Sequence, residues 1–278
     1  MKTRFAAIPA VAFLFLALGA AACGGGGTRI LEPDPIVVPP PPDEEPPPPP
    51  SLPTLGSVTR IYAFGDSLTE GESQGQLLWD VYTSHNHGTP GKITSYPYKL
   101  QTLLDDTYGD DAISVFNGGV GGERAAFSAT MERMVAEITQ YKPHVVLFMH
   151  GVNDLNAGAQ SGEDEDETID RAIGAVEELI EVARVTGSPK PHVMVGSLPR
   201  QNKTTKAISG HLIKPFNAIL LDVAAEEKAT FVDIYKVVSS AMLMLDGLHP
   251  DETGNQKIAD AFFAAIKAKY ERPPAAIR

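Results

Sequence analysis

The chain has 278 residues and a formal net charge of -12, from 35 acidic and 23 basic side chains. Nucleic acids and anionic bilayer surfaces are bound through basic patches, so this charge balance argues against both as partners. The only cysteine is Cys23, so the folded part is expected to contain neither a disulfide nor a thiolate metal site. Its stability must come from a hydrophobic core, which about 215 folded residues can bury.

Residues 1–22 are predicted to be a secretory signal peptide. A short basic start precedes an apolar stretch that is too short, and too rich in small residues at its end, to span a membrane stably. The end of this segment, Ala20-Ala-Ala-Cys23-Gly24, resembles a bacterial lipoprotein box, in which the cysteine is lipidated and becomes the mature N-terminus. The resemblance implies an exported lipoprotein of the cell envelope, in the outer membrane or facing the periplasm, that contacts the membrane only through this N-terminal anchor.

Lipidation also explains a lone cysteine in an exported chain better than a catalytic thiol does. Ala20 departs from the leucine that is usual three positions before the lipidated cysteine, so cleavage by an ordinary signal peptidase stays open. The lipidation of Cys23 is therefore an expectation from resemblance.

Residues 23–56 are predicted to be the lipidated cysteine and a disordered stalk. Four glycines follow Cys23, and the next stretch holds more than half of the chain's 23 prolines. This composition cannot pack a core and is typical of an extended polyproline spacer of ~3 Å per residue. A ligand for a proline-binding module is the alternative. The folded domain is then expected over 57–272, with a tail at 273–278.

The remaining chain alternates strand-like and helical segments. Runs rich in β-branched and aromatic residues predict buried strands, and apolar residues at helical spacing predict helices between them. This alternation predicts one α/β domain, a three-layer sandwich around a mostly parallel five-stranded sheet. The predicted strands are 58–64, 112–116, 145–149, 192–197 and 230–235, and the predicted helices are 98–106, 125–140, 167–185, 208–228 and 253–269.

A serine, a histidine and an aspartate lie where they could form one site. Ser67 follows the predicted strand 58–64, and sites in open α/β sheets lie at the carboxyl ends of strands. Asp246 and His249 bracket Gly247, a spacing that lets one short turn present both side chains to one cleft. A serine hydroxyl becomes a good nucleophile when a neutral imidazole takes its proton and a carboxylate fixes the tautomer of that imidazole.

Two further fragments follow predicted strands. Asn117-Gly-Gly-Val-Gly-Gly122 is a glycine-rich turn that can bring a backbone N–H close to a substrate oxygen. Gly151-Val-Asn153-Asp154 follows the strand 145–149, and the Asn153 amide can donate to an oxyanion. His150 adjoins this fragment, but a histidine at a strand end is usually a structural residue.

Taken in order, these fragments resemble the four signature blocks of the SGNH hydrolases, also called GDSL esterases and lipases. The resemblance covers roughly residues 57 to 272 and implies the flavodoxin-like strand order of that family. A single block would be weak evidence, whereas four in order at strand ends are strong. The blocks read Gly65-Asp-Ser67-Leu, the glycine turn that ends at Gly122, Gly151-Val-Asn153-Asp and Asp246-Gly-Leu-His249.

The resemblance also implies residue roles. Ser67 would be the nucleophile, His249 the base and Asp246 the carboxylate that orients it. The oxyanion hole would consist of the Ser67 N–H, the Gly122 N–H and the Asn153 side chain.

The implied function is a serine esterase, expected to be monomeric, that hydrolyses carboxylic esters through an acyl-enzyme intermediate without a cofactor or metal. Expected substrates are a small ester or an acylated glycan; a lipase, a thioesterase and a catalytically silent carbohydrate-binding domain on the same scaffold are the alternatives. The segment 72–95 contains Trp79 and Tyr82 but is otherwise polar. This favours short acyl groups, because a long chain gains only when its methylenes are buried in an apolar groove.

Three other patterns have simpler explanations than the chemistry they suggest. Ser73 lies in a Gly-x-Ser-x-Gly pattern, but no apolar strand leads into Gly71, so a loop is favoured over a nucleophile elbow. The acidic run 163–167 lacks the glycine and alternating ligands of an EF-hand, and it suits a helix N-terminus. His85 and His87 have no acidic or cysteine partner at ligand spacing, so no metal site is assigned.

Overall fold

The computed structural model describes residues 52–71, 94–109 and 112–274. Contacts divide the chain into Met1–Pro48 and Pro49–Arg278, and the fold below is that of the second unit. No helix in the described ranges is long and apolar enough to cross a membrane. The predictions for the signal peptide, Cys23, most of the stalk, Ser73, Trp79, Tyr82, His85 and His87 lie outside the described residues.

Five strands form one sheet in the order β2-β1-β3-β4-β5. Every neighbouring pair is parallel, which confirms the predicted fold class, and the order is that of a flavodoxin-like doubly wound sheet. The central strands β1 and β3 are buried almost throughout, as expected for a parallel sheet covered on both faces. The strands are β1 (Arg60–Gly65), β2 (Ser114–Gly119), β3 (Val145–Met149), β4 (His192–Gly196) and β5 (Thr230–Val232).

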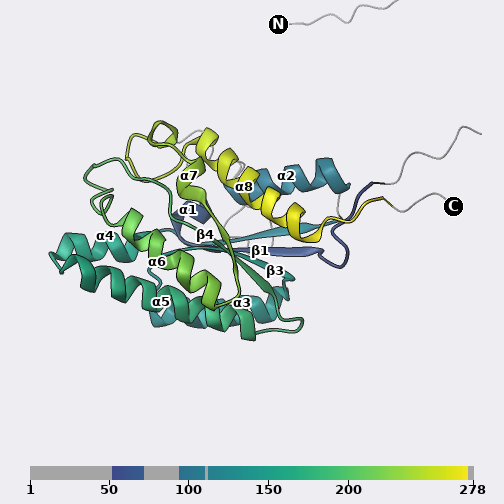
Figure 1. The fold of residues 1–278 in the computed structure, drawn as a ribbon, viewed down its shortest axis with the longest axis horizontal. Helices are drawn as coiled ribbons and strands as arrows, with labels where there is room; N and C mark the ends of the chain where they lie inside the picture. Colours follow the sequence, from purple (N-terminus) through teal and green to yellow (C-terminus); the bar gives the residue numbers. More distant parts are fainter. Residues whose placement is uncertain (1–51, 72–93, 110–111, 275–278) are drawn as a thin grey trace, which may run out of the picture. The chain divides into compact units, whose positions relative to one another are not determined.

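Helices cover both faces of the sheet and complete three layers (Figure 1). On one face α2 (Tyr96–Tyr108) packs against α8 (Glu252–Tyr270). On the other face α5 (Glu165–Val185) packs between α3 (Ser128–Tyr141) and α6 (Ile213–Glu226). All five correspond to predicted helices, with ends shifted by a few residues.

The sequence did not predict α4 (Val152–Ser161), which follows β3 directly. Its residues are mostly small or polar, so it lacks the apolar stripe that marks a helix in a sequence. The strand predicted over 230–235 is also too long. It ends at Val232 because the Asp233 side chain accepts a hydrogen bond from Lys236 N at 3.1 Å and caps the short helix α7 (Ile234–Val237).

Candidate active site

The turn after β1 places Ser67 at the carboxyl edge of the sheet. Asp66 caps the short helix α1 (Ser67–Glu70), because its Oδ1 accepts a hydrogen bond from Leu68 N at 3.0 Å. Gly65 allows this turn to lie close to the sheet: a Cβ there would stand 2.2 Å from Thr69 Oγ1 and 2.3 Å from Met149 O. Ser67 is consequently buried as the first residue of α1.

A second turn, between the 3-10 helix η2 (Ser240–Met242) and α8, carries Asp246 and His249. The Oδ1 atom of Asp246 accepts hydrogen bonds from Leu248 N at 3.0 Å and from His249 N at 3.1 Å. Gly247 adopts a left-handed φ of 73°, and its carbonyl accepts a hydrogen bond from Asn202 N at 2.7 Å. The turn is therefore closed by its own side chain and anchored to a neighbouring loop.

The structure brings the predicted serine, histidine and aspartate together. Ser67 Oγ lies 2.8 Å from His249 Nε2, and His249 Nδ1 lies 2.6 Å from Asp246 Oδ2. When Nδ1–H is donated to Asp246, Nε2 carries the lone pair that can accept the hydrogen bond of the Ser67 hydroxyl. Partial burial tends to raise the pKa of Asp246, but the hydrogen bonds from the His249 side chain and the two backbone amides outweigh it and lower the pKa. Asp246 thus stays ionised beside the imidazole.

The glycine-rich segment 117–122 is divided between the end of strand β2 and the turn that follows it. β2 extends to Gly119, beyond the predicted end at Phe116, because Gly118 and Gly119 let other groups approach the strand closely. A Cβ on Gly118 would lie 1.9 Å from the Tyr62 hydroxyl, and one on Gly119 would lie 2.0 Å from Glu70 N. These two glycines serve packing, and the turn itself begins after them.

Gly122 belongs to the turn proper. It has a left-handed φ of 76°, is exposed, and has no atom within 4 Å of the place where a Cβ would be. A Cβ on the preceding Gly121 would lie 4.0 Å from Ser67 Cβ, so this turn lies beside the serine.

Asn153 lies in the first turn of α4, and its side chain reaches the same turn. Its Nδ2 donates a hydrogen bond to the backbone carbonyl of Glu123 at 2.9 Å. An amide nitrogen has two hydrogens, so one N–H remains for another acceptor. The neighbouring Asp154 is fully buried and turned to the backbone instead: its carboxylate accepts hydrogen bonds from Ala125 N at 2.7 Å and Ala126 N at 3.1 Å.

Two charged residues close to this site, Glu123 and Arg133, were not predicted from the sequence. Glu123 accepts hydrogen bonds from Arg133 Nε at 3.0 Å and from His150 Nε2 at 3.2 Å. Burial acts to raise the pKa of Glu123, but the hydrogen bonds from His150 and Arg133 outweigh it and lower the pKa. No motif marks these residues, because a charged side chain on a predicted helix or turn is usually solvent-exposed.

Asp66 and His150 face each other behind Ser67. The carboxylate of Asp66 is buried, and its Oδ2 has no hydrogen-bond partner within the described part of the chain. His150 Nδ1 lies 3.8 Å from that oxygen and already accepts a hydrogen bond from Gly151 N at 3.0 Å. Burial raises the pKa of Asp66 to about 6, although His150 and the Leu68 amide act to lower it. Two acceptors therefore face one another whenever Asp66 is ionised.

Replacing Asp66 with Asn should stabilise the protein at neutral pH. The folded state holds the Asp66 proton more tightly than the unfolded state, so this group makes stability fall as pH rises from about 4 to about 6. Asn keeps an acceptor for Leu68 N and does not titrate. The free energy of unfolding of Asp66→Asn should exceed that of the unsubstituted protein by on the order of 1 to 3 kcal/mol at pH 7.

Urea unfolding of both proteins at pH 4, 5, 6 and 7 measures this difference. The stabilisation should shrink progressively below pH 6. A difference that is the same at every pH would show that Asp66 does not titrate in this range.

Other acidic residues have protein partners. Glu163 accepts hydrogen bonds from Arg171 Nε at 3.1 Å and from Arg171 Nη2 at 2.7 Å. Asp164 caps α5 by accepting hydrogen bonds from Asp166 N and Glu167 N, the arrangement expected for acidic residues at a helix N-terminus. Among the described residues, no group of three or more His, Cys, Asp or Glu side chains is placed to hold a metal ion.

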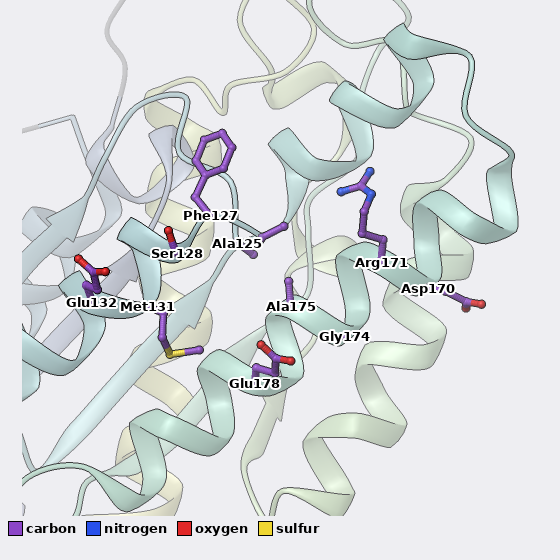
Figure 2. Close-up of a pocket in the computed structure, with 11 residues that line it drawn as sticks. Ala125, Phe127, Ser128, Met131, Glu132, Asp170, Arg171, Gly174, Ala175 and Glu178 are labelled. Atoms are coloured by element: carbon purple, nitrogen blue, oxygen red, sulfur yellow. The ribbon is translucent and has the colours of Figure 1, made fainter.

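A separate open cavity of about 660 Å³ lies between the start of α3 and the middle of α5 (Figure 2). Phe127, Ser128 and Met131 border it on one side, and Arg171, Ala175 and Glu178 on the other. Neither the serine, histidine and aspartate nor Gly122 and Asn153 line it. The cavity is thus distinct from the cluster around Ser67.

Comparisons with known proteins identify the family of the chain. The model of the GDSL-like Lipase/Acylhydrolase family matches residues 63–257, a range that includes Ser67, Gly122, Asn153, Asp246 and His249. No curated protein matches the chain.

Solved structures share the fold at low sequence identity. An acetylxylan esterase from Geobacillus stearothermophilus is 20% identical with a TM-score of 0.58, over 78% of this chain and 98% of that one. A lipase/acylhydrolase from Enterococcus faecalis is 20% identical with a TM-score of 0.56, over 79% of this chain and 100% of that one. Because the family model covers well over half of the chain, this protein belongs to the GDSL-like lipase/acylhydrolase family and is a carboxylic ester hydrolase of the SGNH type.

Proposed function

We propose that the protein is a serine esterase that cleaves short-chain carboxylic esters through an acyl-enzyme intermediate. The observation that carries this proposal is the pair of hydrogen-bond distances that joins Ser67 Oγ to His249 Nε2 at 2.8 Å and His249 Nδ1 to Asp246 Oδ2 at 2.6 Å. An imidazole held in this way can take the serine proton as the hydroxyl attacks, and the carboxylate stabilises the imidazolium that forms.

Acylation begins when Ser67 Oγ attacks the ester carbonyl carbon while His249 Nε2 takes its proton. The carbonyl oxygen becomes an oxyanion, to which the Ser67 N–H, the Gly122 N–H and the second Asn153 N–H donate hydrogen bonds. Donors held in place before the reaction stabilise this developing charge without reorganising. The intermediate then collapses: His249 Nε2–H protonates the leaving alkoxide, the alcohol departs, and the acyl group stays on Ser67.

Deacylation repeats these steps with water. His249 Nε2 takes a proton from a water molecule that attacks the acyl carbonyl, and the same donors receive the second oxyanion. When that intermediate collapses, the proton on His249 returns to Ser67 Oγ and the carboxylic acid leaves. No cofactor or metal is needed to balance either half-reaction.

Polar groups around Ser67 support a preference for short acyl groups. A Cβ on Gly121 would lie 2.7 Å from Glu70 Oε2 and 4.0 Å from Ser67 Cβ, so a carboxylate borders the turn beside the serine. A long acyl chain needs a continuous apolar groove, because each methylene contributes ~0.8 kcal/mol only when it is buried. The fold similarity to an acetylxylan esterase makes an acetylated glycan the substrate class to test first.

An acyl-length series tests this preference. With p-nitrophenyl esters from acetate to palmitate, kcat/KM should be highest between acetate and butyrate and should fall at longer chains. A value that rises steadily past octanoate would identify a lipase instead. Release of acetate from an O-acetylated xylan, measured beside hydrolysis of p-nitrophenyl acetate by the same preparation, would separate glycan esterases from enzymes that act only on small esters.

A further inference from the structure

Glu123 lies at a branch point beside the candidate oxyanion hole. Its backbone carbonyl accepts the hydrogen bond from Asn153 Nδ2 at 2.9 Å, and it directly follows Gly122 in the chain. Its carboxylate points into the protein, with only 10% of the side chain exposed, and binds Arg133 and His150. Glu123 thus links the two candidate oxyanion donors outside Ser67, the Gly122 N–H and the Asn153 amide, to a buried ionic network.

Arg133 connects that carboxylate to the sheet. From α3 its guanidinium donates through Nε to Glu123 Oε1 at 3.0 Å and through Nη2 to Glu123 Oε2. It also donates to the carbonyl of Gly118 at 2.8 Å and to that of Gly65 at 3.4 Å, at the carboxyl ends of β2 and β1. The guanidinium lies 4.0 Å from the centre of the Phe64 ring, and its Nη1 also donates to the Glu137 carboxylate at 2.8 Å. The planar five-donor geometry of arginine allows these contacts at once.

His150 connects the same carboxylate to the end of β3. Its side chain is fully buried and packs near the rings of Phe64 and Phe148, with centroids 5.9 and 6.2 Å away. The backbone N–H of Gly151 donates to its Nδ1 at 3.0 Å, so in the neutral ring Nε2 carries the proton and donates to Glu123 at 3.2 Å. The orientation of this ring is therefore fixed. The ring lies two residues before Val152, the first residue of α4, and Asn153 is the second residue of that helix.

We propose that Glu123, Arg133 and His150 are positioning residues that hold the Gly122 N–H and the Asn153 amide in place beside Ser67. The three residues join the ends of β1, β2 and β3, from which the nucleophile and both donors come. Desolvation offsets much of the Coulomb energy of a buried ion pair, but removing one partner is strongly destabilising, so the test must follow folding as well as kcat. The inference rests on the proposed serine esterase mechanism and adds to it the groups that act through Gly122 and Asn153.

The test compares two network variants of the full-length protein with a matched control, using p-nitrophenyl acetate. Glu123→Gln should lower kcat by about 10- to 100-fold with KM changed by less than about threefold, because displaced donors weaken only the transition state. Arg133→Lys keeps the charge but loses the two-pronged geometry, so it should lower kcat by a smaller factor. The control, Glu227→Gln, breaks the partly buried ion pair with Arg184 and should leave kcat within about twofold.

A double variant separates positioning from general destabilisation. If Glu123 acts through the Asn153 amide, Glu123→Gln should lower kcat much less in an Asn153→Ala background than in the unsubstituted protein. A kcat for Glu123→Gln equal to that of Glu227→Gln would overturn the inference, and full multiplication of the two losses would overturn the part of it that concerns Asn153. Thermal unfolding of each variant checks that it is folded at the assay temperature. If Glu123→Gln is unfolded there, the kcat of Arg133→Lys relative to the control tests the inference instead.

The outcome for the proposed function can be read separately. If Ser67→Ala keeps full activity, the serine mechanism itself is wrong. If Ser67→Ala and Asn153→Ala are impaired while Glu123→Gln and Arg133→Lys match the control, only the positioning inference fails.

Discussion

Replacing Ser67 with alanine is expected to lower the turnover of p-nitrophenyl acetate by on the order of 10⁴- to 10⁶-fold, as the loss of a nucleophile that acts as one unit with its base does. The variant loses the hydroxyl proposed to attack the ester carbonyl, whose Oγ lies 2.8 Å from His249 Nε2. The unfolding temperature should change little, because the hydroxyl is small and the helix cap is made by Asp66 rather than by Ser67. Steady-state kinetics and thermal unfolding of the same preparation measure both quantities.

A rival serine supplies the control for this experiment. Ser73 lies in the Gly-x-Ser-x-Gly pattern only six residues further along the chain. Ser73→Ala should keep activity within about threefold, because no apolar strand leads into Gly71, as a nucleophile elbow at Ser73 would require. If Ser73→Ala loses activity and Ser67→Ala keeps it, the nucleophile has been assigned to the wrong motif.

The Ser67 cluster could be predicted from the sequence because its parts obey local rules. A buried strand followed by a short polar motif places that motif at the carboxyl edge of a parallel sheet, wherever the strand lies in the chain. Asp246 and His249 needed only a three-residue turn to meet Ser67, which is 182 positions away from the histidine. The strand 145–149 was predicted with its correct ends because it is apolar at every position.

The limits of β2 could not be predicted in the same way. Glycine in a sequence indicates a turn, yet Gly118 and Gly119 belong to the strand because Tyr62 and Glu70 approach their backbone closely. That requirement comes from neighbouring elements and leaves no mark in the local sequence. α4 was missed for a related reason: it is held at the sheet edge by contacts of residues such as Asp154 with the 125–126 backbone, and its own sequence has no strong helical pattern.

The buried network of Glu123, Arg133 and His150 could not be predicted from the sequence either. Arg133 and Glu123 are ten residues apart, one on a helix and one in a turn, and each would be exposed if its element stood alone. They are buried because the Arg133 side chain reaches from α3 to the ends of β1 and β2, where it binds Glu123. His150 was expected to be a structural residue. Its hydrogen bonds with Gly151 and Glu123 fix the orientation of its ring, which the sequence could not predict.

Replacing Asn153 with alanine is expected to lower kcat by about 10²- to 10³-fold with little change in KM, the effect of losing a donor that acts mainly in the transition state. One N–H of the amide is committed to the Glu123 carbonyl at 2.9 Å, and the other is the candidate donor to the oxyanion. Asn153→Asp should be at least as impaired, because a carboxylate cannot donate to either oxygen and repels the negative charge.

Asn156, one turn further along α4, provides the matched control for this loss. Its Oδ1 accepts hydrogen bonds from Ser209 N at 3.2 Å and Ser209 Oγ at 2.8 Å, so Asn156→Ala removes an amide from the same helix without touching the Gly122 turn. Kinetics with p-nitrophenyl acetate should then show a large fall in kcat for Asn153→Ala and a change of less than about threefold for Asn156→Ala. If Asn153→Ala raises KM and leaves kcat unchanged, Asn153 binds the ground-state ester, and the oxyanion would have to be stabilised by the backbone donors of Ser67 and Gly122 alone.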